Sequence, residues 1–298
     1  MNTTRRDFLR YCGMSAATLG LTATDLFTLS EALANPNGPA VLWLQGSGCT
    51  GCSVSLLNRV AAQAPATAGD LLINSINLVY HPNLMTASGV SAVEAINAAY
   101  ARGGYVLAVE GGVPTAFGGA AGWAMTEASG HELTIAEAVK KYGARAAAIV
   151  CMGTCASWGG IPASGSNPTG IRGVGAFLGR PTINVGGCPP HPDWMVWPIV
   201  QLILNRPIAK DSFGRPTAIF RTKVHERCPL KERDEAKYWG QPLSCLKSLG
   251  CRGPEAVAPC PTQRWNNGVN FCAEAGAPCL NCTSAAFPGR DAFHKFPG

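Results

Sequence analysis

Two kinds of pattern are missing from this 298-residue chain. Beyond the first 34 residues no stretch reaches about 18 uninterrupted apolar residues, so no membrane span is predicted. No basic helix and no strand motif with interleaved aromatic residues is present, which argues against nucleic-acid binding. Charged residues are few, at 14%, and apolar residues make up 47%. A chain of 298 residues with this apolar content is long enough for one large or two ordinary globular domains.

The last third of the chain, from His225 to Cys282, lacks apolar periodicity and so cannot build much core by itself. It holds seven of the thirteen cysteines at short spacings, among them His225-x2-Cys228 and Cys279-x2-Cys282. Soft thiolates spaced in this way select zinc or iron–sulfur clusters, so a metal group is expected to order the segment. Most of the net charge of +6 also lies in residues 210–298, which fits steering of an acidic electron-transfer partner and simple solubility equally well.

The first 34 residues have the pattern of an export signal. Arg5 and Arg6, followed by Phe8 and Leu9, form a twin-arginine pattern, and a mildly apolar run continues to about Leu29. Residues 32–34 read Ala-Leu-Ala, a cleavage site of small residues. We therefore predict export to the periplasm by the twin-arginine pathway, with cleavage after about residue 34. An ordinary amphipathic N-terminal helix is the less favoured alternative.

From residue 39 to about residue 206, apolar runs alternate with helical patterns. Strands are expected at 41–44, 71–79, 105–109, 146–150 and 181–185, and helices at 53–64, 90–100 and 135–141. This alternation predicts an α/β fold with a flavodoxin-like doubly wound parallel sheet, followed by a loop-rich cluster domain. The expected division is a signal peptide at 1–34, the flavodoxin-like domain at 35–209 and the C-terminal domain at 210–298.

Cysteines follow three of the predicted strands. Cys49 and Cys52 come after the first strand, Cys155 follows the strand at 146–150, and Cys188 follows the strand at 181–185. Functional loops of such sheets lie at the carboxyl ends of the strands. Cysteines that are distant in sequence are therefore expected to meet at one edge of one sheet.

One glycine motif could indicate nucleotide binding instead of a metal centre. Gly46-x-Gly48-x-x-Gly51 follows a strand and opens a helix, as the dinucleotide-binding fingerprint does. The acidic residue of that fingerprint should end the second strand, but Asp70 stands before it. Cysteines also fill the place where a pyrophosphate would lie, so nucleotide binding is not favoured.

The twelve cysteines that remain after removal of the signal could in principle form six disulfides in an exported protein. Three features argue against disulfides: the chain has a core of its own, Cys49-x2-Cys52 opens a helix, and His225 joins the pattern as a ligand would. Zinc stays open as an alternative, because spacing alone does not separate it from an iron–sulfur cluster.

Taken together, the motifs resemble the small, electron-transferring subunit of periplasmic nickel–iron hydrogenases, and most closely the branch that includes the nickel–iron–selenium enzymes. The resemblance covers nearly the whole chain. It rests on the twin-arginine signal and on residues 42–53, 153–160, 187–194, 225–229, 249–254 and 264–268.

The resemblance implies three iron–sulfur clusters. A proximal 4Fe-4S cluster would be held by Cys49, Cys52, Cys155 and Cys188, and a distal 4Fe-4S cluster by His225, Cys228, Cys245 and Cys251. A medial cluster would be held by Cys260, Cys272, Cys279 and Cys282. This medial cluster is expected to be 4Fe-4S, and it would be 3Fe-4S if Cys272 is not a ligand.

The resemblance also implies the activity and the partners. The chain would carry electrons between the Ni-Fe site of a hydrogenase large subunit and an external carrier, such as a c-type cytochrome, during reversible oxidation of H2. It would hold no catalytic residue itself. The alternatives are an exported binding protein stabilised by zinc or disulfides, and the cluster subunit of another exported redox complex.

Several residues near the motifs are assigned smaller roles. Cys151 is left over and is predicted to be a structural thiol at the end of a strand. Gly51 and Gly160 occupy the places where oxygen-tolerant relatives carry two extra cysteines, so that mechanism is expected to be absent. Ser53 is expected to cap the first helix, and His81 to be an ordinary loop or surface histidine.

Overall fold

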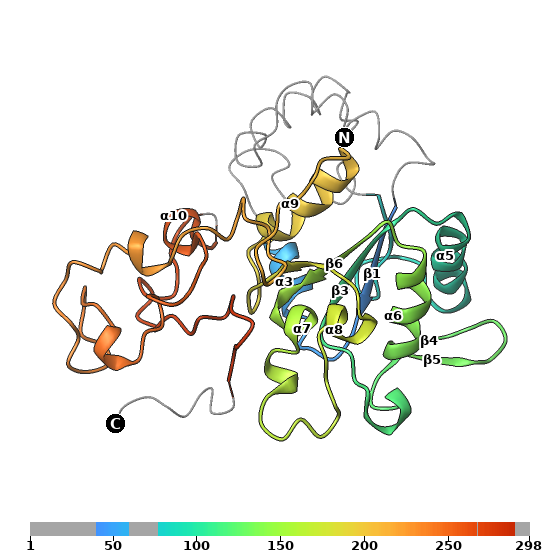
Figure 1. The fold of residues 1–298 in the computed structure, drawn as a ribbon, viewed down its shortest axis with the longest axis horizontal. Helices are drawn as coiled ribbons and strands as arrows, with labels where there is room; N and C mark the ends of the chain where they lie inside the picture. Colours follow the sequence, from blue (N-terminus) through green and yellow to red (C-terminus); the bar gives the residue numbers. More distant parts are fainter. Residues whose placement is uncertain (1–39, 60–76, 267, 290–298) are drawn as a thin grey trace.

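The computed structural model describes residues 40–59, 77–266 and 268–289. Its centre is a five-stranded parallel sheet with the strand order β2-β1-β3-β6-β7 (Figure 1). The strands are β1 (Val41–Gln45), β2 (Leu78–Tyr80), β3 (Val106–Glu110), β6 (Ala148–Met152) and β7 (Ile183–Val185). Counted within the sheet this is the order 2-1-3-4-5 of flavodoxin-like folds, so the predicted fold class is confirmed.

The helices cover both faces of the sheet (Figure 1). On one face lie α3 (Gly51–Leu57) and α9 (Pro192–Ile203), and on the other α5 (Gly89–Arg102) and α6 (Ile135–Ala144). Alternate residues of β1 divide between the two faces: Trp43 joins the core that contains α9, and Leu44 joins the core that contains α5 and α6. Burial on both sides explains why these strands are continuous apolar runs without alternation.

Several predicted bounds differ from the structure. The helix predicted at 53–64 begins at Gly51 and ends at Leu57, while residues 60–64, like 71–76 of the second strand, lie outside the described residues. β6 begins two residues later than predicted, at Ala148. Helix α9 has no counterpart in the sequence prediction, because it is apolar on nearly all sides and contains Pro198, which hides the helical period.

Shorter elements complete this part of the chain. A two-stranded antiparallel hairpin of β4 (Trp123–Thr126) and β5 (Glu132–Thr134) leads into α6. Thr134 caps α6: its hydroxyl accepts from the Glu137 N–H at 3.2 Å, and the Glu137 carboxylate accepts from the Thr134 N–H at 2.8 Å. Helices α7 (Gly153–Trp158) and α8 (Val174–Leu178) follow β6.

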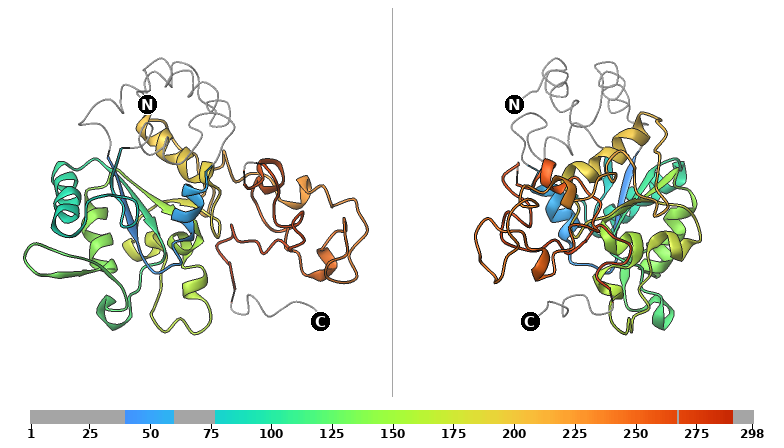
Figure 2. Two further views of the ribbon diagram at one scale, coloured as in Figure 1. Left: turned by 180° about the vertical axis from the view of Figure 1, so that it is seen from behind. Right: turned by 60° about the vertical axis from the view of Figure 1, so that its left-hand side comes forward.

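The segment from residue 204 to residue 289 is mostly turns, as its lack of periodicity predicted. Its regular elements are η3 (His225–Arg227), η4 (Lys247–Leu249) and α10 (Cys260–Gln263). The segment lies beside α3 and α9 in both views (Figures 1 and 2), and Phe220, Val224 and Phe271 share one apolar core with α9. The boundary at 209/210 stays a prediction. In the part of the chain described here, no helix is long and apolar enough to span a membrane.

Candidate metal centres

Cys49, Cys52, Cys155 and Cys188, here called the proximal group, come together at the carboxyl edge of the sheet. Cys49 lies in the loop after β1, Cys52 is the second residue of α3, Cys155 lies in α7 and Cys188 follows β7. The pKa of Cys52 is raised well above its usual value, first by burial, then by Glu110 and then by the other three cysteines. Thiols that are distant in sequence thus lie at one edge of the sheet, near enough to influence one another. Their role as cluster ligands stays a prediction.

Glycines keep the space around these sulfurs clear. A Cβ atom at Gly153 would lie 2.5 Å from Cys52 Sγ, and Gly153 has a φ of +86°, which disfavours other residues. A Cβ atom at Gly51 would lie 3.0 Å from Cys49 Sγ. A Cβ atom at Gly160, where φ is +53°, would likewise lie 3.0 Å from Cys155 Sγ. The four soft donors thus face a cradle that side chains would fill, which fits a bound cluster better than a packed core.

The glycines of the dinucleotide-like motif have a different function. Gly46 and the Gly111–Gly112 turn approach so closely that a Cβ at Gly46 would stand 2.5 Å from the Gly112 carbonyl oxygen. Ser47 and Gly112 exchange two backbone hydrogen bonds of 2.8 Å. The loops after β1 and β3 are therefore held together directly, and the glycine spacing serves this loop pairing and not a phosphate.

Glu110, the last residue of β3, is a buried carboxylate beside the proximal group, with only 2% of its surface exposed. Its Oε1 accepts hydrogen bonds from the backbone N–H groups of Cys52 at 2.9 Å and Ser53 at 3.2 Å. Its Oε2 accepts from the Ser53 hydroxyl and from Trp43 Nε1, the latter at 3.2 Å. Glu110 thus fixes the first turn of α3, and hence the direction in which Cys52 points.

Two predictions near this network need correction. Ser53 does not cap α3: the cap position is Thr50, with a φ of +62°, and Ser53 lies inside the helix with its hydroxyl bonded to Glu110. His81 lies in a loop, one of the two expected settings, but it is fully buried and its ring packs at a tilt on Trp43, with 5.1 Å between ring centroids. Both errors arose because a sequence shows only the neighbours along the chain, and Glu110 is 57 residues from Ser53.

The contacts of His81 define its tautomer. Nδ1 accepts a hydrogen bond from the Asn83 N–H at 3.1 Å, so the proton of the neutral ring lies on Nε2, which donates to the Ser53 hydroxyl at 3.1 Å. Burial lowers the pKa of His81 to about 4. A neutral histidine therefore ends a chain of hydrogen bonds that runs through Ser53 to Glu110.

His225, Cys228, Cys245 and Cys251, here called the distal group, lie in the turns of the C-terminal segment. The pKa of Cys228 is raised mainly by burial, with further contributions from Cys251 and Cys245. A Cβ atom built at Gly253 would lie 3.6 Å from Cys251 Sγ and 3.7 Å from His225 Cβ, so these two side chains approach the same point. The His225 N–H also donates to the Gly253 carbonyl at 3.0 Å, which brings the two ends of this group together.

Cys260, Cys272, Cys279 and Cys282, here called the medial group, gather around the start of α10. Burial is the largest cause that raises the pKa of Cys260, followed by Cys282, Cys279 and Cys272 in that order. Cys272 also raises the pKa values of Cys279 and Cys282. The structure therefore brings Cys272 to the other three cysteines.

Hydrogen bonds join the three groups in a row. The hydroxyl of Thr154, the residue before Cys155 of the proximal group, donates to the carbonyl oxygen of Cys282 in the medial group. The N–H of Cys279, in the medial group, donates to Cys251 Sγ of the distal group at 3.2 Å. The medial group therefore lies between the other two.

The remaining thiol, Cys151, is fully buried in β6, apart from the three groups, and burial raises its pKa to about 12. All twelve cysteines of the described residues are free, so the structure offers no support for the disulfide alternative. No three His, Cys, Asp or Glu side chains within the described ranges are close enough to share a single metal ion.

Two family models match the chain. The one described as "NADH ubiquinone oxidoreductase, 20 Kd subunit" matches residues 49–202, and one for the C-terminal region of the NiFe/NiFeSe hydrogenase small subunit matches residues 220–295. The periplasmic [NiFeSe] hydrogenase small subunit of Desulfomicrobium baculatum is 36% identical over 318 aligned positions, which cover 99% of each chain. The chain belongs to the nickel–iron hydrogenase small subunits. The periplasmic [NiFe] hydrogenase small subunit of Solidesulfovibrio fructosivorans is 35% identical, with 95% of this chain and 90% of that protein covered.

Solved structures of hydrogenases share the fold. The [NiFeSe] hydrogenase of Desulfovibrio vulgaris Hildenborough in the oxidized state matches with a TM-score of 0.79 and 35% identity, over 87% of this chain and 98% of that chain. The H2-activated [NiFeSe] hydrogenase of Dm. baculatum matches with a TM-score of 0.78 and 37% identity, over 87% and 99%. This hydrogenase small subunit is thus part of an oxidoreductase that acts on H2 and pairs with a large subunit. Neither alternative function is favoured by these relatives.

Proposed function

We propose that this hydrogenase small subunit transfers single electrons through three 4Fe-4S clusters, between the nickel site of its large subunit and an external carrier. The observation that carries the proposal is the arrangement of twelve candidate ligands as three groups of four in a row. The Thr154 hydroxyl, next to Cys155, donates to the Cys282 carbonyl, and the Cys279 N–H donates to Cys251 Sγ. When bound, the clusters would supply one-electron chemistry, with potentials set by burial and by hydrogen bonds to the sulfurs.

The donor chemistry of each group fits a cluster. The proximal and medial groups would each supply four thiolates, and the distal group would supply three thiolates and the imidazole of His225. The sulfurs of the proximal and medial groups influence one another electrostatically. Zinc and iron–sulfur clusters both take four such donors, and the match to hydrogenase small subunits supports iron–sulfur clusters over zinc.

The protein prepares these sites by keeping water away. Burial is the first cause that raises the pKa values of Cys52, Cys155, Cys279 and Cys282, to about 12 for the last three. Without metal these groups are therefore neutral thiols, and each bound iron must displace their protons. This supports assembly of the clusters as a condition for the final packing of the C-terminal segment.

The two ends of the row would face different partners. Cys49 is exposed, and Val54 and Leu57 of the neighbouring helix α3 are 50% and 45% exposed although they are apolar. Such a patch beside the proximal group supports docking of the large subunit there. The distal group would then serve the carrier, for example a c-type cytochrome.

We also propose that residues 1–34 are a twin-arginine signal, cleaved after about Ala34, and that the mature chain works in the periplasm. The sequence supports this by its paired arginines and by the small residues before Asn35. Several relatives are themselves named periplasmic small subunits. The mature chain would consist of the domains 35–209 and 210–298.

The test is metal and sulfide analysis of the complex purified without oxygen with its large subunit. About twelve irons and twelve sulfides per copy of this chain, beyond the iron of the large subunit, are expected for three 4Fe-4S clusters. Nickel should be present in the same complex. Zinc in place of iron, or iron without acid-labile sulfide, would contradict the proposal. A count near eleven irons would assign a 3Fe-4S medial cluster.

A further inference from the structure

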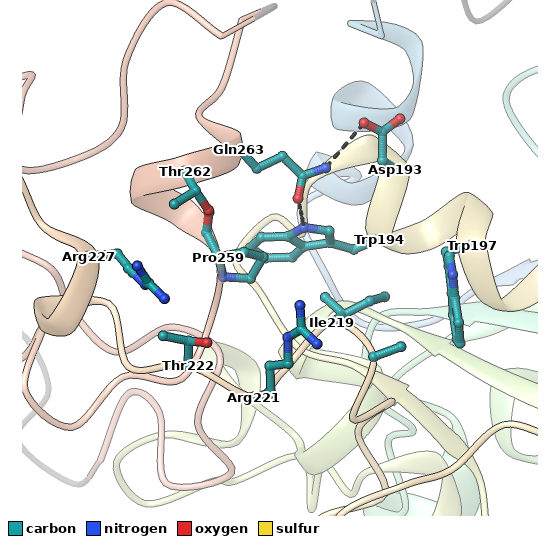
Figure 3. A pocket seen from close by; sticks show the side chains of 11 residues that line it. Asp193, Trp194, Trp197, Ile219, Arg221, Thr222, Arg227, Pro259, Thr262 and Gln263 are labelled. Carbon is teal, nitrogen blue, oxygen red and sulfur yellow. Dashed lines mark hydrogen bonds between the residues drawn. The ribbon is translucent and has the colours of Figure 1, made fainter. Parts of the chain in front are cut away.

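A hollow of about 340 Å³ opens between α9 and the C-terminal segment (Figure 3). Its walls come from α9, from residues 218–222, from Arg227 and from the start of α10. Trp194 makes one wall rigid: it is 2% exposed, packs edge-on against Phe220 at 5.5 Å, and donates a hydrogen bond from Nε1 to Gln263. The shape of the hollow is thus fixed by packed aromatic groups.

The hollow is lined by positive charge without a partner. The guanidinium groups of Arg221 and Arg227 both point into it (Figure 3), and both residues are exposed. Neither forms an ion pair or a side-chain hydrogen bond with any other residue that the structure describes. The acidic residue of the lining, Asp193, is already engaged: it bonds to Arg59 at 3.0 Å and to Gln263 at 3.2 Å.

Several other cations of the C-terminal segment have carboxylate partners. Arg252 pairs with Glu255 at 2.9 Å, and Arg264 pairs with Glu274 at 2.7 Å. Lys231 and Lys247 also have carboxylate neighbours. Arg221 and Arg227 are two of the cations in this segment without a carboxylate partner among the described residues, and both line one hollow. Two guanidinium groups at one hollow make it complementary to carboxylates.

The hollow also adjoins the candidate ligands. Arg227 ends η3, which begins at His225, and its neighbour in the chain is Cys228. On the opposite side, the lining residue Pro259 directly precedes Cys260. A protein surface seated here would lie next to the distal group, which is the end of the row away from Cys49.

We propose that this hollow is the docking site of an acidic one-electron carrier protein, whose surface carboxylates bind the guanidinium groups of Arg221 and Arg227. The inference rests on the proposed function, because only a chain with metal centres needs such a partner. At each encounter one electron passes from the distal cluster, which is oxidised by one electron, to the cofactor of the carrier, which is reduced by one electron. No atom is transferred. Attraction between the opposite charges mainly accelerates the encounter of the two proteins, and this attraction weakens as the salt concentration rises.

The experiment uses the complete complex and a mitochondrial-type cytochrome c in two forms: native, with its lysines, and fully succinylated, with carboxylates in their place. Binding is measured under argon without H2, so that no turnover contributes. The test variant is Arg221→Gln with Arg227→Gln. The matched control is Arg233→Gln with Lys237→Gln, which removes the same charge from exposed positions outside the hollow.

We expect the succinylated form to bind more tightly than the native form, and binding to weaken as salt is raised. The test variant should bind it about tenfold more weakly at low salt, whereas the control should change by less than about twofold. The ratio of cytochrome reduction to viologen reduction under H2 should fall in the same way.

Equal losses in the two double variants, or tighter binding of the native cytochrome, would overturn the proposal. So would failure of the test variant alone to copurify with the large subunit, because the hollow would then belong to the interface between subunits. Failure of the proposed function would look different: the wild-type complex itself would lack iron, sulfide and viologen activity.

Discussion

The carboxylate of Glu110 accepts a hydrogen bond of 2.9 Å from the backbone N–H of Cys52. These residues are 58 positions apart: Glu110 ends β3, and Cys52 lies in the first turn of α3, which follows the neighbouring parallel strand β1. The bond places a buried acidic group beside one candidate ligand of the proximal group. Contacts of this kind, one step behind the ligands, orient them and tune the metal that they bind.

Replacing this carboxylate should therefore change the proximal cluster. In Glu110→Gln a negative charge is lost, and the amide NH2 would face the N–H donors of Trp43 or Ser53. We expect a loss of about 1–3 kcal/mol in stability and a more positive reduction potential of the proximal cluster, because the added electron is no longer repelled. A redox titration followed by electron paramagnetic resonance measures the potential. Glu94→Gln, at an exposed position on α5, is the matched control and should leave the potential unchanged.

The role of Gly153 can be tested by adding one methyl group. In Gly153→Ala the new Cβ would lie 2.5 Å from Cys52 Sγ, at a φ of +86°. The iron content should fall by about four per chain, the content of one 4Fe-4S cluster. Gly130→Ala is the control: its φ is +83°, but the new Cβ would meet nothing within 4 Å. That variant should lose only about 1–2 kcal/mol of folding stability through backbone strain and should keep its iron. Equal iron loss in both variants would show that Gly153 does not keep space for a cluster.

Cys272 decides the type of the medial cluster. Because Cys272 influences the other three thiols of the medial group, we expect Cys272→Ala to lose one iron per chain and to gain the resonance of an oxidised 3Fe-4S cluster. Mössbauer and electron paramagnetic resonance spectra are the measurements. Cys151→Ala should keep all its iron, since Cys151 lies apart in the sheet. An unchanged spectrum for Cys272→Ala would show that Cys272 is a bystander.

Acid should loosen the region around His81. Its pKa of about 4 in the folded protein is below the usual value of about 6.5. The unfolded chain therefore binds the proton first, so stability is fully present above about pH 6.5 and is lost as the pH falls toward 4, at about 1.4 kcal/mol per pH unit. The free energy of opening of α3, measured by hydrogen exchange of its amides between pH 7 and pH 5, should fall with this slope in the wild type. A His81→Gln variant that retained the same slope would contradict it.

Export should depend on the paired arginines. In a full-length chain with Arg5→Lys and Arg6→Lys we expect the uncleaved precursor to accumulate in the cytoplasm, because the signal is recognised by a receptor. The wild-type protein should begin at about Asn35 when its N-terminus is sequenced. Arg10→Lys should be exported normally. Efficient export of the double variant would exclude a twin-arginine signal.

The fold class and the gathering of the proximal thiols were predictable from the sequence. Both follow from local signals: apolar runs define the strands, and parallel strands bring their carboxyl ends to one edge. Cys49, Cys52, Cys155 and Cys188 each follow a strand, so their meeting could be inferred without coordinates. The motifs around them were also enough to indicate the family, because their residue types and spacings are contiguous in the chain.

The residues that surround the thiols could be identified only from the folded structure. The bonds of Glu110 to Cys52 and Ser53, the burial of His81 and the hollow at Arg221 and Arg227 all join segments that lie far apart in the sequence. No periodicity or spacing encodes such contacts, since they depend on how the elements pack. Ser53 shows the difference: its local sequence suits a helix cap, yet a carboxylate from a neighbouring strand binds its hydroxyl inside the helix.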